Sequence, residues 1–282
     1  MPVAVMHHDD LDGQCAAAIV AKAFGMTEMD TEMVFLPMNY KDEVPLDEIR
    51  DRETYIVDFS LGQQGSWDEA ISASRGLVWI DHHASAIKNS PPAAHALKGL
   101  RAEGKEAGCA LAWRYFFPRV PIPRGVAYIS DYDTWTHEFP ETRDFKAGLE
   151  AAYDTRPSSP VWYYLLGGAD TFVGEVIDIG VKIRAKKVIS DAMLVEAWAF
   201  DVTFNGHKGI ALNRLQCGSD TFASVADRYE LLLPFVFDGA QYTVSVYRGG
   251  LGASIDCSII AEGYGGGGHP GASGFQCTKL PW

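Results

Sequence analysis

Short apolar runs alternate with polar or small-residue stretches through the first third of the chain. The apolar runs have the length of buried strands, and the stretches between them are compatible with helices. The predicted strands are residues 3–6, 33–37, 55–57 and 77–80, and helices are predicted at residues 16–24 and 67–74. Strands separated by helices in this way indicate βαβ units and a parallel sheet that is covered on both faces.

Helices dominate the next part of the pattern. They are predicted at residues 93–101, 107–117 and 124–130, and residues 171–200 form one long helical stretch. Further strands are predicted at residues 209–213, 231–237 and 242–247, with a helix near residues 222–229. We therefore predict an α/β fold of two domains. Residues 1–180 hold the parallel sheet, and residues 181–282 lead from the long connector helix into a smaller mixed α/β domain.

The composition is that of an ordinary globular protein with an acidic excess. The 282 residues are 47% hydrophobic, and 24 Lys and Arg stand against 37 Asp and Glu, for a net charge of −13. This balance argues against a protein that coats nucleic acid through a diffuse basic surface. No apolar run reaches the roughly 18 residues of a membrane helix. The first residues lack the pattern of a secretory signal, so we expect a cytoplasmic location and no membrane partner.

Ionisable residues cluster where the predicted strands of the first domain end. They are His8, Asp10 and Asp12 after the first strand, Asp58 after the third, Asp81, His82 and His83 after the fourth, and Asp131 and Asp133 at the end of the helix that follows Pro123. In an open parallel sheet, ligands bind beyond the carboxyl ends of the strands. We therefore expect these side chains to converge in space.

Converging carboxylates repel one another unless cations neutralise them. None of the four segments contains Lys or Arg, so divalent cations are the expected counter-charge. Mixed imidazole and carboxylate ligands suit Mn²⁺, with Mg²⁺, Co²⁺ or Fe²⁺ as alternatives, and the five scattered Cys argue against a structural zinc site. Taken singly, Asp12 and Asp58 each also fit a helix cap, and Asp131 and Asp133 each fit a solvated turn.

A glycine-rich segment, GGGGHPGASGF at residues 265–275, lies near the end of the second domain. Glycines allow the backbone to approach a ligand closely, and successive N–H groups then form a site for anions such as phosphate. His269 can add a hydrogen bond there, and Arg248 is a candidate contact to phosphate or base at the end of a predicted strand. The alternatives are a flexible linker and an ordinary surface arginine.

Together these residues resemble the DHH phosphoesterase family, in the branch with a C-terminal DHH-associated substrate-binding domain and near its small oligoribonuclease and phosphoadenosine-phosphate phosphatase-like members. The segments that carry the resemblance are HHDDLDGQCAAAI, the strand end at Asp58, DHH at 81–83, SDYDTW at 130–135 and GGGGHPGASGF. The resemblance implies a catalytic parallel-sheet domain joined by a long helix to the smaller domain, with the active site in the cleft.

The resemblance also implies a role for each site residue. One metal ion would bind His8, Asp10 and Asp58, and a second would bind Asp12, Asp58, His82 and Asp131, with Asp133 as the competitor of Asp131. Asp81 would orient a neighbouring histidine, and His83 would face the substrate phosphate or leaving group. His7 would point to the opposite face. The implied substrate contacts are Arg248, Gly266, Gly267, Gly268 and His269.

The expected activity is that of a metal-dependent phosphoesterase, in which two divalent ions activate water. Expected substrates are short oligonucleotides, linear dinucleotides or phosphoadenosine phosphate, and no long nucleic-acid track is expected. A RecJ-type single-strand exonuclease and a pyrophosphatase or polyphosphatase are the alternative enzymes. A non-catalytic nucleotide-binding protein is the alternative from a different class, and a homodimer is left open.

Overall fold

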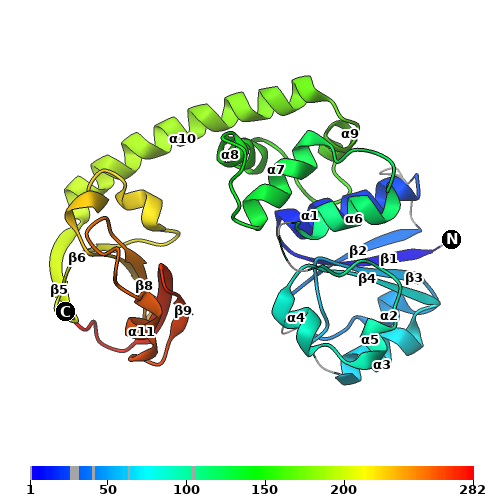
Figure 1. The fold of residues 1–282 in the computed structure, drawn as a ribbon, viewed down its shortest axis with the longest axis horizontal. Coiled ribbons are helices and arrows are strands. Elements are labelled where there is room, and N and C mark those ends of the chain that lie inside the picture. The colour runs from blue at the N-terminus through cyan, green and yellow to red at the C-terminus, as the bar shows by residue number, and fades with distance from the viewer. Residues whose placement is uncertain (1, 26–31, 40–41, 63, 103, 105) are drawn as a thin grey trace. The chain divides into compact units, whose positions relative to one another are not determined.

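The chain folds into two units, Met1–Ile183 and Arg184–Trp282, and one long helix, α10 (Asp170–Trp198), runs from the first into the second (Figure 1). The structure is a computed structural model that describes residues 2–25, 32–39, 42–62, 64–102, 104 and 106–282. Each unit is described by itself below. Among the described residues, no helix is both long enough and apolar enough to cross a membrane.

Four parallel strands form the centre of the first unit. They are β1 (Val3–His8), β2 (Met33–Met38), β3 (Glu53–Val57) and β4 (Gly76–Ile80), in the order β2-β1-β3-β4. In this register the carboxyl ends of β1, β3 and β4 meet at one edge of the sheet. The residues that follow these strands therefore emerge side by side, as the sequence predicts.

Helices cover both faces of this sheet (Figure 1). Side chains of β1 alternate between them: Val3 and Val5 pack into one buried cluster, and Ala4 and Met6 into the other. The first face carries α1 (Leu11–Ala23), α6 (Gly108–Phe116), α7 (Arg124–Asp133) and α9 (Val161–Leu166), and the second carries α2 (Leu46–Ile49), α3 (Gln64–Ala73), α4 (Ala84–Asn89) and α5 (Pro92–His95). Helix α8 (Thr142–Ala152) packs against α7.

The helix predicted at residues 93–101 is wrong beyond His95. β4 is the last strand of the sheet, so one of its edges has no neighbouring strand. Residues 98–100 lie along this edge in extended form: Trp79 N–H donates to Lys98 O at 2.9 Å, and Asp81 N–H donates to Leu100 O at 3.1 Å. Between them Gly99 has φ 129°, which no α-helix accommodates. Pairing with the sheet edge therefore outweighs local helix propensity.

The second unit contains a mixed sheet of six strands in the order β5-β6-β7-β8-β10-β9. The strands are β5 (Phe200–Phe204), β6 (His207–Asn213), β7 (Leu231–Phe237), β8 (Tyr242–Arg248), β9 (Gly267–His269) and β10 (Ala272–Cys277), and α11 (Cys257–Glu262) packs against β8, β9 and β10. Only the β6–β7 pair is parallel among these described strands. The predicted α/β class, with a parallel sheet and a separate mixed sheet, is confirmed.

The helix predicted near residues 222–229 is also wrong. Two 3₁₀ turns, Ser219–Phe222 and Ala226–Arg228, occupy this segment. The carbonyl of Ala226 accepts from Gly250 N–H at 2.7 Å, and that of Tyr229 accepts from Leu251 N–H at 3.0 Å. A neighbouring loop therefore takes the carbonyl groups that a helix would need for itself.

The glycine-rich segment is a short β-hairpin rather than an open loop. β9 pairs antiparallel with β10, so Gly268 lies opposite Ser273 and Gly267 opposite Gly274. Gly268 has φ 142°, and a Cβ there would lie 2.6 Å from the Cα of Ser273. Glycine at this position thus allows the backbones of β9 and β10 to approach each other closely, whether or not the hairpin also binds a ligand.

Candidate metal centre

The turn from β1 to α1 holds His8 and Asp10 as a pair. Asp10 caps α1, since its Oδ1 accepts from Gly13 N–H at 2.9 Å, and its Oδ2 accepts from His8 Nδ1 at 2.7 Å. The hydrogen bond to Asp10 raises the pKa of His8. Burial raises the pKa of Asp10, but the hydrogen bonds from His8 and Gly13 outweigh it and lower that pKa. A Cβ at Gly13 would lie 2.1 Å from His8 O, so this turn requires glycine.

Asp12 is held from across the sheet face by the start of α6. Its two oxygens accept from Gly108 N–H at 2.7 Å and from Cys109 N–H at 2.9 Å, and the residue is 2% exposed. The positive end of the α6 dipole therefore faces this carboxylate. Asp12 is not a cap of α1, the role left open from the sequence. Gly108 and Cys109 were not anticipated, although small residues at a predicted helix start were a signal for them.

Asp58 lies in a strained conformation at the centre of the site. Its φ is 52°, a left-handed value that is uncommon outside glycine, and strain of this kind clusters at functional sites. The residue is 1% exposed, and α6 passes so close that a Cβ on Gly108 would lie 2.5 Å from the Cβ of Asp58. Burial raises the pKa of Asp58 well above its usual range, and the carboxylates of Asp12 and Asp10 add to this effect.

The DHH segment follows β4 and presents two histidines. The Oδ1 of buried Asp81 accepts from the N–H groups of His82 and His83, at 2.8 and 3.1 Å, and from His83 Nδ1 at 2.8 Å. This last hydrogen bond raises the pKa of His83. Burial lowers the pKa of His82, which favours the neutral imidazole that a metal ion requires.

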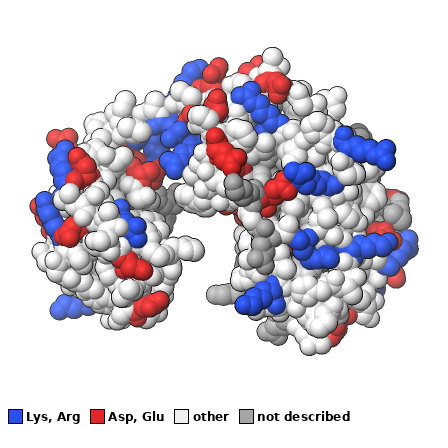
Figure 2. All heavy atoms as spheres, in the orientation of Figure 1, with Lys and Arg blue, Asp and Glu red and all other residues white. Residues whose placement is uncertain are grey.

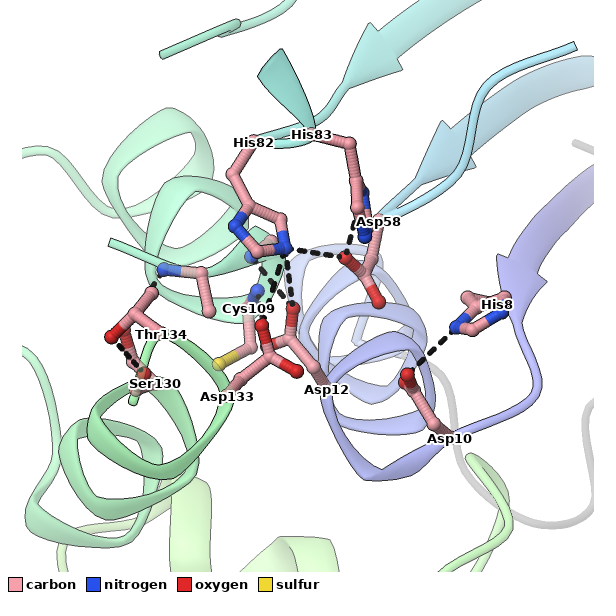
Figure 3. A network of polar contacts seen from close by, with 12 residues as sticks. His8, Asp10, Asp12, Asp58, His82, His83, Cys109, Ser130, Asp133 and Thr134 are labelled. Atoms are coloured by element: carbon pink, nitrogen blue, oxygen red, sulfur yellow. Dashed lines mark hydrogen bonds and ion pairs between the residues drawn. The ribbon is translucent and has the colours of Figure 1, made fainter. Parts of the chain in front are cut away.

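The Nε2 atom of His82 is the point at which the carboxylates converge. It lies 3.2 Å from Asp58 Oδ1, 3.3 Å from Asp133 Oδ2 and 3.9 Å from Asp12 Oδ2 (Figure 3). Burial raises the pKa of Asp133 to about 7, with further contributions from Asp12 and Asp10. Figure 3 also shows the His8–Asp10 pair on the far side of Asp58.

The contacts of Asp131 do not support the expectation that it is a metal ligand. Its Oδ1 accepts from Thr136 Oγ1 at 2.6 Å and from Glu138 N–H at 2.7 Å, and its Oδ2 accepts from Phe139 N–H and Thr142 Oγ1. Burial raises its pKa, but these donors outweigh burial and lower it. Residues two apart in a helix point about 200° apart, so α7 directs Asp131 into the protein and Asp133 toward His82.

Three groups of described side chains could each hold a metal ion, and they overlap. They are His8, Asp10 and Asp58; Asp58, His82 and His83; and Asp12, His82 and Asp133. Asp58 and His82 each belong to two groups, which is the arrangement of two neighbouring ion positions. Asp58 Oδ1 and His82 Nε2 are buried 3.2 Å from each other, and neither forms a hydrogen bond with the described residues. Because buried polar atoms are rarely left unsatisfied, this donor set fits divalent cations.

His7 does not join these groups. Its ring is 1% exposed, and its Nδ1 lies 2.8 Å from His8 O, on the opposite side of the strand from the His8 ring. Burial lowers the pKa of His7, although the hydrogen bond to His8 opposes this. The interpretation that His8 rather than His7 faces the centre therefore agrees with where the two rings lie.

The predicted substrate contacts lie together in the second unit. Arg248 Nη2 donates to Pro270 O at 2.9 Å, so this side chain sits against the turn of the β9–β10 hairpin. Its Nε is buried without a hydrogen bond to the described residues. His269 and the three glycines before it are exposed on β9 or directly beside it. The hairpin therefore groups Arg248 with Gly266, Gly267, Gly268 and His269.

In the N-terminal unit, carboxylates and histidines converge at the carboxyl ends of parallel strands. This arrangement is typical of α/β proteins that bind metal ions. Residues 2–129, which lie in the N-terminal unit, match the model of the DHH family, N-terminal domain.

Three known proteins are similar to the chain over most of its length. Uncharacterized protein R106 of Acanthamoeba polyphaga mimivirus is 28% identical over 268 residues, which are 90% of this chain. The chain spans 61% of the length of that relative. The pGpG-specific phosphodiesterase PggH of Vibrio cholerae has a TM-score of 0.52 at 12% identity, with 98% of this chain and 92% of that one covered. The PF0399 DHH domain, of the s1p family of ribosomal proteins, has a TM-score of 0.56 at 14% identity, with 97% and 82% covered. The two structures share the fold.

Proposed function

We propose that the chain is a metal-dependent phosphoesterase that hydrolyses short nucleotide substrates by two-metal activation of water. The observation that carries this proposal is the overlap of the three ligand groups at Asp58 and His82, which fits two adjacent ions. The match of residues 2–129 to the DHH family model supports the hydrolysis of phosphoesters. Mn²⁺ is the proposed ion because imidazole and carboxylate ligands occur together, and Mg²⁺ and Co²⁺ are the alternatives.

His8, Asp10 and Asp58 would hold one ion, and Asp12, Asp58, His82 and Asp133 would hold the other. Two bound ions would clamp the phosphate oxygens and lower the pKa of a water molecule, as in other two-metal sites. The amides of Gly108 and Cys109 fix the Asp12 carboxylate, and the backbone of Asp58 fixes the shared ligand, so little reorganisation is needed when ions bind.

His83 is proposed to face the substrate. Asp81 Oδ1 accepts a hydrogen bond from His83 Nδ1, which fixes the ring and supports a positive charge on it, since the same contact raises the pKa of His83. A protonated imidazole at this place would stabilise negative charge on a phosphate oxygen or give a proton to the leaving group. Asp81 itself acts through His83 and is a positioning residue.

The second unit is proposed to be the DHH-associated domain that binds the rest of the substrate, through Arg248, His269 and the glycines of β9. Guanidinium and imidazole groups with exposed glycine amides are suited to phosphate. On the face that Figure 2 shows, described Lys and Arg side chains are interspersed with Asp and Glu instead of forming one basic track, which favours short substrates. PggH, which has this fold, acts on pGpG, so a linear dinucleotide is the first substrate to test.

The test is a hydrolysis screen with Mn²⁺ on five substrates: a linear dinucleotide, longer RNA, single-stranded DNA, phosphoadenosine phosphate and pyrophosphate. We expect the dinucleotide or phosphoadenosine phosphate to give the highest kcat/KM. Asp9→Ala is the matched control for substitutions at the centre, because Asp9 is an exposed carboxylate in the same turn and belongs to none of the three groups. Preference for long single-stranded DNA would favour an exonuclease, and inactivity with every metal would favour a nucleotide-binding protein.

A further inference from the structure

A tryptophan stands exposed directly after the helix that supplies Asp133. Helix α7 ends at Asp133, Thr134 caps it, and Trp135 follows with 70% of its surface exposed. Consecutive Cα atoms are about 3.8 Å apart, so the Cα atoms of Asp133 and Trp135 lie within about 7.6 Å of each other. The backbone of Trp135 therefore lies close to that of a candidate ligand, and its indole ring is exposed.

The backbone at Trp135 is strained. Its φ is 55°, and the first residue beyond a helix cap adopts this left-handed conformation most readily when it is glycine. A bulky aromatic residue with positive φ is an outlier, and such outliers cluster at functional sites. Asp58, the shared residue of the metal centre, is another outlier of this kind.

The ring is nevertheless held in place by its neighbours. The Trp135 ring centroid lies 5.3 Å from that of His137, edge to face, and 5.9 Å from that of Tyr132. Tyr132 in turn is contacted by Lys146, whose Nζ lies 4.8 Å from the centroid of the Tyr132 ring. The contacts with His137 and Tyr132 cover part of the indole, and 70% of the Trp135 surface remains exposed as an aromatic face.

Four hydrogen bonds to Asp131 hold the loop that carries Trp135. They tie Thr136, Glu138, Phe139 and Thr142 to the end of α7, so the chain on both sides of Trp135 is anchored. This explains why α7 carries one buried and one centre-facing aspartate. Asp133 faces His82 in the candidate metal centre, and Asp131 fixes the loop that presents the ring.

We propose that Trp135 is a stacking platform for a nucleobase of the substrate whose phosphate is held at the metal centre. The proposal rests on the proposed function and deepens it, because it assigns base recognition to the N-terminal unit. Stacking suits this place, since an uncharged π-face adds affinity for any base without competing with the carboxylates for cations. It also selects substrates that carry a base next to the scissile phosphate over pyrophosphate and polyphosphate.

The test compares two substrates: a linear diribonucleotide and the same phosphodiester of two riboses without bases. For Trp135→Ala we expect KM for the dinucleotide to rise about tenfold or more, the fold-change for losing one base–aromatic stack. The kinetic parameters for the base-free substrate should change less than about twofold. Trp135→Phe should recover most of the loss, because the phenyl ring also stacks.

Two further variants separate recognition from folding. Trp135→Gly relieves the left-handed strain, so its melting temperature should be no lower than that of Trp135→Ala while its KM stays high. Tyr163→Ala is the matched control, because Tyr163 is 82% exposed and lines a pocket with Lys22, about 15 Å along α1 from Asp12. It should leave both substrates unaffected.

Equal losses on both substrates, or no loss on either, would overturn the platform. Binding of a hydrolysis-resistant phosphorothioate dinucleotide, measured by calorimetry with Mn²⁺ present, keeps the two proposals apart. If wild type cleaves nothing but binds this ligand about tenfold more tightly than Trp135→Ala, the platform stands and the proposed function fails. If wild type cleaves the dinucleotide and Trp135→Ala binds and cleaves it equally well, the platform alone fails.

Discussion

The metal centre and the glycine-rich hairpin are built on opposite plans. At the centre, two carboxylates are each fixed by named donors: buried Asp12 by two amides of α6, and Asp10 by His8 and an amide of α1. In the hairpin, Gly267 and His269 are exposed, and a Cβ on Gly267 would meet nothing within 4 Å. In the first region these side chains are held in position before a ligand binds, whereas the hairpin presents an exposed surface. Substitutions should therefore act on rate in the first and on affinity in the second.

The largest effect is expected from Asp58→Asn. Asparagine tolerates positive φ and keeps the shape of the side chain, but it removes the charge that both ion positions share. We expect activity to fall at least about a thousandfold and the number of bound Mn²⁺ per chain to decrease. In EDTA the free energy of unfolding should be equal or higher, because a buried charge beside Asp12 and Asp10 is gone. Retained activity, or a large loss of stability in EDTA, would contradict the role of Asp58.

Gly108→Ala and Gly267→Ala test the comparison with the same chemical change. At Gly108 the new Cβ would lie 2.5 Å from Asp58 Cβ and displace the amides that hold Asp12, whereas at Gly267 it meets open space. We expect Gly108→Ala to lose about 1–3 kcal/mol of stability and about a hundredfold in activity. Gly267→Ala should stay within about 0.5 kcal/mol of wild type. Similar urea-unfolding curves for the two variants would remove the distinction between the regions.

Asp131→Asn separates support of the loop from metal binding. The variant should lose about 2 kcal/mol of stability at pH 7 but retain the Mn²⁺ stoichiometry, whereas Asp133→Asn should lose bound Mn²⁺. The pKa of Asp131 is lowered in the folded protein, so its contribution is present above its unfolded pKa of about 3.9 and disappears as pH falls through the folded pKa. The difference in unfolding free energy between wild type and Asp131→Asn should therefore shrink below about pH 4. Loss of bound Mn²⁺ from Asp131→Asn at pH 7 would instead indicate that Asp131 is a metal ligand.

The smallest effect is expected from Arg248→Gln in the second unit. If Arg248 contacts phosphate through one charge-assisted hydrogen bond, KM should rise about tenfold with kcat nearly unchanged. Steady-state kinetics on the best substrate of the screen would measure this. A fall in kcat without a change in KM would mean that Arg248 acts on the chemical step, contrary to the contrast between the two regions.

The ends of β1, β3 and β4 could be predicted from the sequence because each of these apolar runs is short and is followed closely by ionisable residues. The register of a parallel sheet then brings His8, Asp58 and His82 together without further information. The contacts that hold them could not be predicted. Gly108 N–H reaches Asp12 across 96 residues of chain, and no local pattern encodes such a pairing. The choice between Asp131 and Asp133 depends on how α7 is rotated about its axis, which is decided by packing.

The errors in secondary structure have a similar origin. Residues 93–101 have helical propensity, but the open edge of β4 recruits residues 98–100 through hydrogen bonds to Trp79 and Asp81. Residues 222–229 lose their helix because the loop at Gly250 takes the carbonyl of Ala226. In both places a distant segment competes for backbone groups, and such competition is invisible to a local window.

The hydrogen bonds between Asp12 and the start of α6 also provide a spectroscopic handle. A cation that shares the Asp12 oxygens withdraws electron density from them, which weakens their hold on the Gly108 and Cys109 protons. The amide ¹H and ¹⁵N resonances of these two residues should therefore move as Mn²⁺-free protein is titrated with diamagnetic Mg²⁺. Occupancy of the centre could then be followed residue by residue in a protein that is not turning over.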